Sequence, residues 1–326
     1  MNAQWHEILD QIRRGQRFLI AIHVRPDGDS IGSSLALRYA LQAIGKQVVM
    51  LRVDEIPSAL RFLPGIDDFV LPGEVEGEFD AVLFLDCGGL ERVGDAQEVI
   101  ARAKVKINID HHLSNSRFGD INYIDDQAAA VGEIVIKLIR DLGVELNWPI
   151  AMGIYVALVT DTGSFQFEST SSETHRIAAD LLDAGVRPAA VARQVWENKP
   201  IAWLRLLQKA LSSLKITDNG QISWITISQE TLAQTGATAS DTEGLVSYAR
   251  MIDGVEAAAL FFEEEPDVIK VSLRSNRWLN VSEVAKQFNG GGHARAAGCV
   301  VRQPLERAVE VVVQAMQAAM VTVRNA

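Results

Sequence analysis

Residues 18–30 decide the fold of this chain and read Phe-Leu-Ile-Ala-Ile-His-Val-Arg-Pro-Asp-Gly-Asp-Ser. The first five are apolar without alternation, which is typical of a parallel strand buried on both faces. A polar loop, His23–Asp29, follows. A mostly apolar helix is then expected from about Ser30, a suitable N-cap, to Gly45, a suitable stop. A strand, a short loop and a helix in this order indicate one unit of an α/β fold.

Three further apolar segments extend this unit into a sheet. They are Val48–Leu51, Asp80–Leu85 and Val105–Ile109, and helical stretches lie between most of them. Strands that alternate with helices predict an α/β domain built on a doubly wound, mostly parallel sheet.

Acidic and histidine side chains gather where these strands end. The set comprises His23, Asp27 and Asp29 after the first strand, Asp86 after the third, and Asp110, His111 and His112 after the fourth. In open parallel sheets, ligands bind beyond the carboxyl ends of the strands. Carboxylates gathered there would repel one another and raise their own pKa values unless cations offset the charge. The pattern therefore predicts two divalent metal ions, with Mn²⁺ favoured and Mg²⁺, Fe²⁺, Co²⁺ or Zn²⁺ as alternatives.

Each motif taken alone has a simpler interpretation. Asp27-Gly28-Asp29 after a proline is ordinary turn chemistry. Asp86 could cap a neighbouring loop, the Asp-His-His run would suit a surface loop, and Asp161-Thr162-Gly163 could stop a helix. The combination favours a metal site, because four separate acidic motifs each stand at the end of a strand or helix.

The second half of the chain follows a different pattern. From about Val131 to Leu214 it is mainly helical, and one helix, Pro149–Thr160, runs directly into Asp161. Paired strands come next, at Leu214–Thr217 with Ile222–Ile227 and at Ala257–Phe262 with Val268–Leu273. A glycine-rich turn, another strand and a closing helix complete the pattern, which predicts a second, smaller α/β domain.

Length, charge and cysteine content limit the classes of function. A chain of 326 residues is long for one hydrophobic core and suits two domains. Its net charge of -11 argues against gripping long nucleic acid, so any nucleic-acid substrate should be short. No membrane span is expected, because no apolar run reaches roughly 18–20 residues. The polar N-terminus is unlike a signal peptide, and Cys87 and Cys299 are expected as reduced thiols, which predicts a cytoplasmic location.

The ordered motifs carry a resemblance to a known family. His23-x3-Asp27-x-Asp29, Asp86, Asp110-His111-His112 and Asp161 match the four motifs of the DHH phosphoesterase superfamily, and Phe288–His293 resembles the glycine-rich signature of the associated DHHA1 domain. The compact layout is similar to the nanoRNase/pAp phosphatase group. The resemblance implies a DHH catalytic domain at 1–186, a helical linker at 187–213 and a DHHA1 substrate-binding domain at 214–326.

The resemblance also implies roles for single residues. One metal ion would be held by His23, Asp27 and Asp86, and the other by Asp29, Asp86, His111 and Asp161. Asp86 would thus bridge two ions that assist hydrolysis at phosphorus. His112 would face the scissile phosphate, and Asp110 would orient the histidines.

The second domain offers candidate contacts to the substrate. They are Arg274, Ser275, Gly291, Gly292 and His293, with Arg117 of the first domain as a further candidate. Glycines let backbone N–H groups approach an anion closely, and an arginine gives a forked phosphate contact. On the pattern alone, a tight turn between a helix and a strand is an equal alternative. Arg295 is either a further contact or a solvated side chain.

The activity implied by the resemblance is hydrolysis of oligoribonucleotides of a few residues and of 3′-phosphoadenosine 5′-phosphate (pAp). A phosphodiesterase for pApA or cyclic-di-AMP is a close alternative, because the same catalytic set serves both. A family II inorganic pyrophosphatase is disfavoured by the Gly-Gly-Gly-His run. A non-catalytic nucleotide- or RNA-binding module would have lost metal ligands, and here all are present. The sequence leaves open the choice of substrate, the cleavage polarity and the oligomeric state, with a homodimer as one option.

Overall fold

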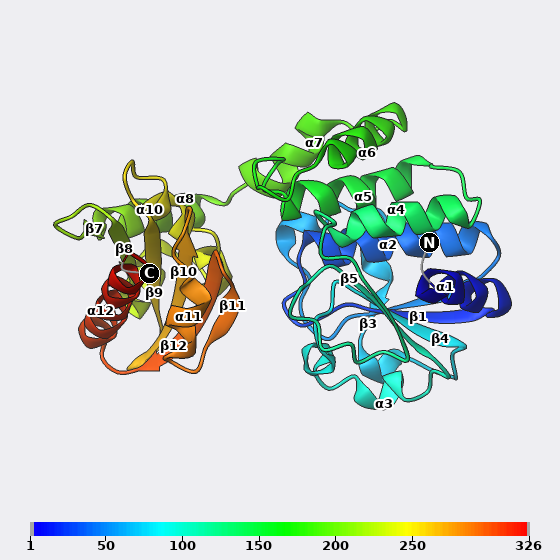
Figure 1. The fold of residues 1–326 in the computed structure, drawn as a ribbon, viewed down its shortest axis with the longest axis horizontal. Helices are drawn as coiled ribbons and strands as arrows, with labels where there is room; N and C mark the ends of the chain where they lie inside the picture. Colours follow the sequence, from blue (N-terminus) through cyan, green and yellow to red (C-terminus); the bar gives the residue numbers. More distant parts are fainter. Residues whose placement is uncertain (1–2, 325–326) are drawn as a thin grey trace. The chain divides into compact units, whose positions relative to one another are not determined.

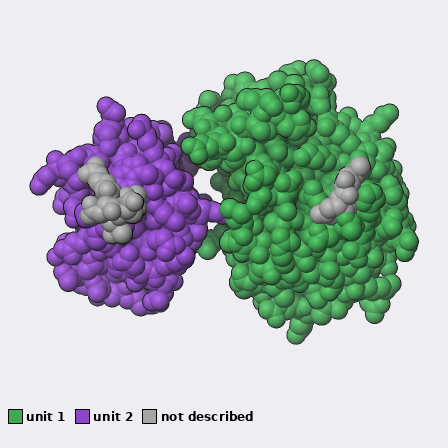
Figure 2. Space-filling model, in the orientation of Figure 1, with its two compact units in different colours: residues 1–198 green, residues 199–326 purple. Residues whose placement is uncertain are grey.

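A computed structural model describes residues 3–324, and it divides into two compact units. The first unit is Met1–Asn198 and the second is Lys199–Ala326 (Figure 2). The segment 187–213, predicted as a helical linker, is shared between them: the helices up to residue 197 belong to the first unit and the helix from residue 201 to the second.

The first unit is built on a parallel sheet. Its strands are β1 (Arg17–Ala21), β2 (Gln47–Leu51), β3 (Phe69–Val70), β4 (Ala81–Leu85), β5 (Lys106–Asp110) and β6 (Ile121–Ile124). Their order is β3-β2-β1-β4-β5-β6, and every neighbouring pair is parallel. The predicted doubly wound parallel sheet is confirmed, and the edge strands β3 and β6 are additions that the sequence pattern did not predict.

Helices cover both faces of this sheet (Figure 1). The α-helices are α1 (Ala3–Arg14), α2 (Gly28–Ala43), α3 (Gln97–Ile100), α4 (Val131–Asp141), α5 (Trp148–Asp161), α6 (Ser172–Asp183) and α7 (Pro188–Ala192). A π-helix, η5 (Arg193–Glu197), and short 3₁₀ helices, η1 (Ser58–Leu60), η2 (Ile66–Asp68), η3 (Pro72–Glu74) and η4 (Leu90–Val93), complete the unit. Side chains of β1 alternate between two cores, with Phe18 and Ile20 facing one and Leu19 and Ala21 the other.

The start of α2 differs from the sequence prediction. The helix begins at Gly28, and its N-cap is Asp27 rather than Ser30, which lies inside the first turn. The Asp27 carboxylate accepts a hydrogen bond from the Ser30 amide at 3.0 Å. An aspartate is as good an N-cap as a serine, and it also places negative charge at the positive end of the helix dipole.

Helices α2 and α5 pack closely because glycines face each other at their crossing. A Cβ atom at Gly153 would lie 2.5 Å from the Gly32 carbonyl oxygen, and a Cβ at Gly32 would meet the Gly153 carbonyl. Asp29 stands in the first turn of α2, and Asp161 is the last residue of α5. The glycine contact therefore sets the separation of two helices that each carry a candidate metal ligand.

The second unit is a smaller α/β structure around a mixed sheet. It contains α8 (Ile201–Ser212), β7 (Lys215–Ile216), β8 (Ile222–Ile227), α9 (Gln229–Thr235), η6 (Ala239–Thr242), α10 (Val246–Arg250), β9 (Ala257–Glu265), β10 (Val268–Ser275), α11 (Val281–Lys286), β11 (Gly291–His293), β12 (Ala296–Arg302) and α12 (Leu305–Arg324). The strand order is β11-β12-β10-β9-β8-β7, with β8 and β9 parallel and the other neighbours antiparallel. Separate cores lie on its two faces. Part of the predicted glycine turn is in fact the short strand β11.

No helix in the described part of the chain is both long and apolar enough to cross a membrane.

The glycine contact between α2 and α5 gives a stability prediction. Gly153→Ala should lower the free energy of unfolding by about 1–3 kcal/mol, because the new methyl group meets a backbone oxygen that cannot move aside. The same substitution in an exposed helix would be favourable. Urea denaturation measures the change, and calorimetric Mn²⁺ titration should show weaker binding as α5 shifts.

Gly73→Ala is the matched control, because a Cβ there would meet nothing within 4 Å. An unchanged stability in Gly153→Ala would mean that the two helices have room to separate at no cost.

Candidate functional site

The predicted ligands come from neighbouring elements of the first unit. His23 follows β1, Asp86 follows β4, and His111 follows β5. These three strands are adjacent in the sheet and parallel, so their carboxyl ends meet at one edge. The N-terminus of α2 and the C-terminus of α5 bring Asp29 and Asp161 to the same place.

Ligand atoms at this edge form three overlapping groups. They are His23 with Asp27 and Asp86; Asp29 with His111 and Asp161; and Asp86 with Asp110, His111 and His112, each group having its atoms within 4.8 Å of one another. Asp86 lies between the histidines, with one carboxylate oxygen 3.4 Å from His23 Nε2 and the other 3.6 Å from His111 Nε2. All six residues expected to hold metal are therefore brought together, and Asp86 occupies the shared position.

The carboxylates in this cluster destabilise one another's charged forms. Burial, reinforced by Asp27 and Asp29, raises the pKa of Asp86 well above its ordinary value. Burial and the nearby Asp161 raise the pKa of Asp29 to about 7, and burial raises the pKa of Asp161 to about 6. Cations bound in this cluster would lower these pKa values and so favour the charged carboxylates near neutral pH.

Two buried polar atoms in the cluster indicate where cations fit. His23 Nε2 and Asp86 Oδ1 have no hydrogen-bond partner among the described residues. The opposite ring nitrogens face backbone carbonyls: His23 Nδ1 lies 2.8 Å from Val24 O, and His111 Nδ1 lies 3.0 Å from Ala128 O. A carbonyl only accepts, so the contact with Ala128 O puts the hydrogen on His111 Nδ1 and leaves the Nε2 lone pair toward the cluster. On His23 the same arrangement holds when Nε2 serves as a metal ligand. The residues present therefore fit a pair of divalent metal ions.

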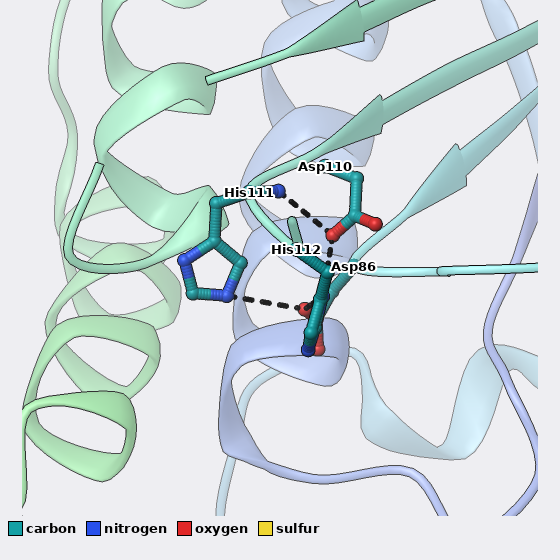
Figure 3. Close-up of side chains that lie close together, drawn as sticks. All are labelled: Asp86, Asp110, His111 and His112. Atoms are coloured by element: carbon teal, nitrogen blue, oxygen red, sulfur yellow. Dashed lines mark hydrogen bonds and ion pairs between the residues drawn. The ribbon is translucent and has the colours of Figure 1, made fainter. Parts of the chain in front are cut away.

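Asp110 holds the two histidines in position (Figure 3). Its Oδ1 atom lies 2.7 Å from His112 Nδ1 and accepts a hydrogen bond from the His111 backbone amide at 2.8 Å. Burial alone would raise the pKa of Asp110, but hydrogen bonds from His112 and Asn115 hold that pKa below its usual value. Asn115, which donates to Asp110 Oδ2 at 2.5 Å, was not anticipated from the sequence, because a lone asparagine after the motif looks like loop chemistry.

Asp29 is anchored by the N-terminus of α4. Its carboxylate accepts hydrogen bonds from Val131 N at 2.6 Å, from Gly132 N at 3.0 Å and from Ser33 Oγ at 2.9 Å. A side chain at Gly132 would meet Ala157 on α5, since a Cβ there would lie 2.8 Å from the Ala157 Cβ. These contacts between helices could not be predicted from sequence, because the residues of α4 that contact Asp29 lie 102 and 103 positions away and only the fold brings α4 to α2 and α5.

The substrate-binding candidates of the second unit also lie near one another. Arg274 on β10 and His293 on β11 are both paired across β12 with Ala296. Some of these groups serve the fold: the Ser275 hydroxyl donates to Leu279 O at 2.6 Å, and a Cβ at Gly292 would lie 2.5 Å from Ala296 O. Gly291 differs, because a Cβ there would meet nothing within 4 Å.

Three further arginines differ in how the fold uses them. Arg295 donates to Leu279 O at 2.9 Å, which uses one of its nitrogens in the fold. Arg250 was not anticipated; its Nε is buried without a hydrogen-bond partner among the described residues, and burial together with its charge lowers the pKa of Arg274. Arg117 is exposed, and its backbone amide donates to Asn115 Oδ1 at 2.7 Å, so its side chain remains only a proposed contact.

Comparison with known proteins agrees with this fold. The model of the DHH family N-terminal domain matches residues 17–159, and that of the DHHA1 domain matches residues 221–322. A parallel-sheet domain with an acid–histidine cluster, followed by a smaller mixed-sheet domain, defines a hydrolytic enzyme of the phosphoesterase class. The chain belongs to the DHH family of phosphoesterases and carries its DHHA1 domain.

Relatives cover nearly the whole chain. A bifunctional oligoribonuclease and PAP phosphatase NrnA of Thermus thermophilus is 34% identical over 91% of this chain and 88% of its own length. The protein of the same name from Bacillus subtilis is 30% identical over 90% and 92%.

Solved structures show the same architecture. An exopolyphosphatase-related protein of Bacteroides fragilis superposes with a TM-score of 0.92 at 30% identity, over 97% of this chain and 96% of that one. RecJ of Thermus thermophilus, solved in complex with Mn²⁺, shares the fold at 14% identity, with a TM-score of 0.53 over 97% of this chain and 53% of its own.

The shared position of Asp86 predicts that it is the most damaging ligand to lose. Asp86→Asn removes a charge next to both histidine ligands, so both metal sites should weaken together. We expect turnover to fall by about a thousand-fold or more, since the loss of metal-based charge stabilisation costs several kcal/mol of barrier. Mn²⁺ titration by calorimetry and turnover at saturating Mn²⁺ measure both effects. Near-normal turnover at ordinary Mn²⁺ concentrations would contradict a shared ligand.

The two neighbouring histidines should behave differently when removed. His111→Ala should lower metal content, because its Nε2 lies within 4.0 Å of three carboxylates. His112→Ala should keep its metal and slow the chemical step, because its Nδ1 is held by Asp110. Metal analysis and single-turnover rates of both variants decide the matter. Equal metal loss in the two variants would show that both histidines are ligands.

Proposed function

We propose that this enzyme hydrolyses phosphodiester bonds in short oligoribonucleotides and removes phosphate from pAp. The observation that carries the proposal is the complete ligand cluster around Asp86, with two buried atoms left without hydrogen bonds. Relatives that match along most of this chain are named as oligoribonucleases and PAP phosphatases. We further propose that the two ions are Mn²⁺, which suits mixed carboxylate and imidazole ligands.

Residues of the first unit would supply the remaining chemistry. Two divalent ions, when bound, activate water and offset the charge that develops on the phosphate. Asp110 fixes the ring of His112 through the 2.7 Å contact with Nδ1, and we propose that the other ring edge faces the substrate. There His112 would donate a hydrogen bond to the phosphate or assist the leaving oxygen. The DHHA1 domain would bind the far end of the nucleotide through Arg274 and His293.

Cellular location and assembly belong to the same proposal. We propose a cytoplasmic location, supported by Cys87 and Cys299, which are both buried free thiols. A homodimer stays a prediction that sedimentation measurements can test.

A substrate panel tests the proposed function. With Mn²⁺ present, di- to pentaribonucleotides and pAp should be the best substrates, ahead of pApA, cyclic-di-AMP and pyrophosphate. The rate per bond should drop steeply beyond about five nucleotides, because a protein with a net charge of -11 does not attract a long polyanion. Digestion of a 24-mer as fast as a dimer would exclude selection for short substrates, and exclusive cleavage of pApA would favour the dinucleotide alternative.

One variant pair separates substrate binding by the second unit from folding. Arg274→Ala should lower kcat/KM on a dinucleotide by about ten- to a hundred-fold, the usual cost of one charge-assisted contact. Hydrolysis of bis-p-nitrophenyl phosphate, which lacks the far nucleotide, should barely change. Arg277→Ala is the matched control, an exposed arginine three residues further along the chain. Equal loss on both substrates at wild-type stability would place Arg274 at the reacting centre instead.

A further inference from the structure

Arg92 is a half-buried cation beside the metal cluster, and the motifs described above do not include it. It lies in η4, after the strand that carries Asp86. Its backbone oxygen accepts a hydrogen bond from Val24 N at 2.7 Å, which fastens η4 to the loop that follows β1. Its Nη2 atom lies 2.9 Å from His23 Nδ1. The guanidinium is therefore held next to a metal ligand by both its backbone and its side chain.

The contact with His23 does not satisfy the guanidinium. His23 Nδ1 also lies 2.8 Å from Val24 O, and that carbonyl accepts the ring hydrogen when Nε2 serves as a ligand. In that tautomer Nδ1 has no lone pair left for an arginine, which is a donor only. Arg92 and His23 then present donors to each other, so the guanidinium keeps its hydrogen-bonding capacity for another group.

No carboxylate among the described residues lies within ion-pair distance of Arg92. Two other partly buried arginines of this unit do have such partners: Arg38 contacts Asp68 at 2.5 Å, and Arg52 contacts Glu55 at 3.9 Å. A third, Arg17, donates instead to the backbone carbonyls of Glu76 and Glu78. The adjacent Glu91 does not serve Arg92, because its carboxylate lies against Gly89. A charge taken partly out of water without a counter-ion is unfavourable, so its retention calls for an anion that arrives from outside.

The charges at this edge identify that anion. The ligand carboxylates of Asp27, Asp29, Asp86 and Asp161 carry four negative charges when ionised, which two divalent ions would balance. Asp110 is already paired with His112. Arg92 would then add a positive charge beside the balanced ligand cluster, and a planar guanidinium matches the non-bridging oxygens of a phosphate.

We propose that Arg92 is a substrate-binding residue that donates hydrogen bonds to the phosphate group entering the metal cluster. The proposal rests on the proposed phosphoesterase function and adds a phosphate contact supplied by the same unit as the ligands. It makes the first unit able to bind a phosphate ester without help from the nucleoside portions. The competing role is structural, in which Arg92 only keeps His23 in place.

Two variants and a control distinguish these roles. Arg92→Met removes the charge and keeps the length of the side chain, Arg92→Lys keeps the charge without the fork, and Arg61→Met removes an exposed arginine of the same unit. Calorimetry would measure binding of Mn²⁺ alone and then of inorganic phosphate at saturating Mn²⁺. Steady-state hydrolysis of bis-p-nitrophenyl phosphate would give KM and kcat.

We expect Arg92→Met to bind Mn²⁺ within about twofold of wild type and to bind phosphate about ten- to a hundred-fold more weakly, with a matching rise in KM. Arg92→Lys should recover part of the phosphate affinity, and Arg61→Met should bind both as wild type. Loss of Mn²⁺ affinity in parallel with phosphate affinity, or unchanged phosphate affinity, would overturn the proposal in favour of the structural role.

Two further comparisons keep the result interpretable. If thermal unfolding shows that Arg92→Met does not fold, Arg92→Lys, which lacks the forked guanidinium, becomes the deciding variant. The proposal then requires that Arg92→Lys weaken phosphate binding at unchanged Mn²⁺ affinity. Inorganic phosphate and the generic ester also separate this proposal from the proposed function. If wild type cleaves the generic ester but no oligoribonucleotide or pAp, the proposed function fails, while the phosphate data still test Arg92.

Discussion

The candidate site of the first unit is built around the carboxylate of Asp86, which is buried among other carboxylates. Its side chain is only 3% exposed, and its pKa is raised by burial and by the neighbouring aspartates. Its backbone is left-handed, with φ of 61°, a conformation that costs a non-glycine residue on the order of 1–3 kcal/mol. Asp86 is therefore not a residue that stabilises the folded state. Cations bound beside the carboxylate, as proposed above, would turn its repulsion by the neighbouring aspartates into a net attraction for the site.

The sheet and the helices hold the crowded carboxylates and histidines in fixed positions. Adjacent parallel strands fix His23, Asp86 and His111 at one edge, while backbone amides at the start of α4 hold Asp29. The glycine contact between Gly32 and Gly153 then brings the acidic ends of α2 and α5 together. Strand pairing, helix packing and hydrogen bonds from backbone amides thus place these groups, although their carboxylates repel one another.

The sequence revealed the strands, the ligand types and the edge where they meet, because burial on both faces and strand-end chemistry leave local patterns. It could not reveal features that depend on long-range packing. Asp27 rather than Ser30 caps α2, since the choice between adjacent caps depends on where the loop enters the helix. The two-residue strand β3 is too short for a pattern. Asn115 and Arg250 look like ordinary loop and helix residues until the fold sets them beside Asp110 and Arg274.

In the glycine-rich run of the second unit, a structural role and an anion-binding role do not exclude each other. Gly292 has a φ of 139° and leaves no space for a Cβ beside Ala296, so the strand β11 itself requires a glycine there. Gly291 next to it has open space, so nothing in the fold demands a glycine at that position. The motif therefore contains one glycine, Gly292, that the backbone conformation requires, and a neighbour, Gly291, beside which the backbone is open. The fold satisfies the Ser275 hydroxyl internally, whereas the buried Nε of Arg250 has no hydrogen-bond partner among the described residues. If this unit binds an anion, as proposed, we expect the arginines rather than the glycine-rich motif as a whole to hold it.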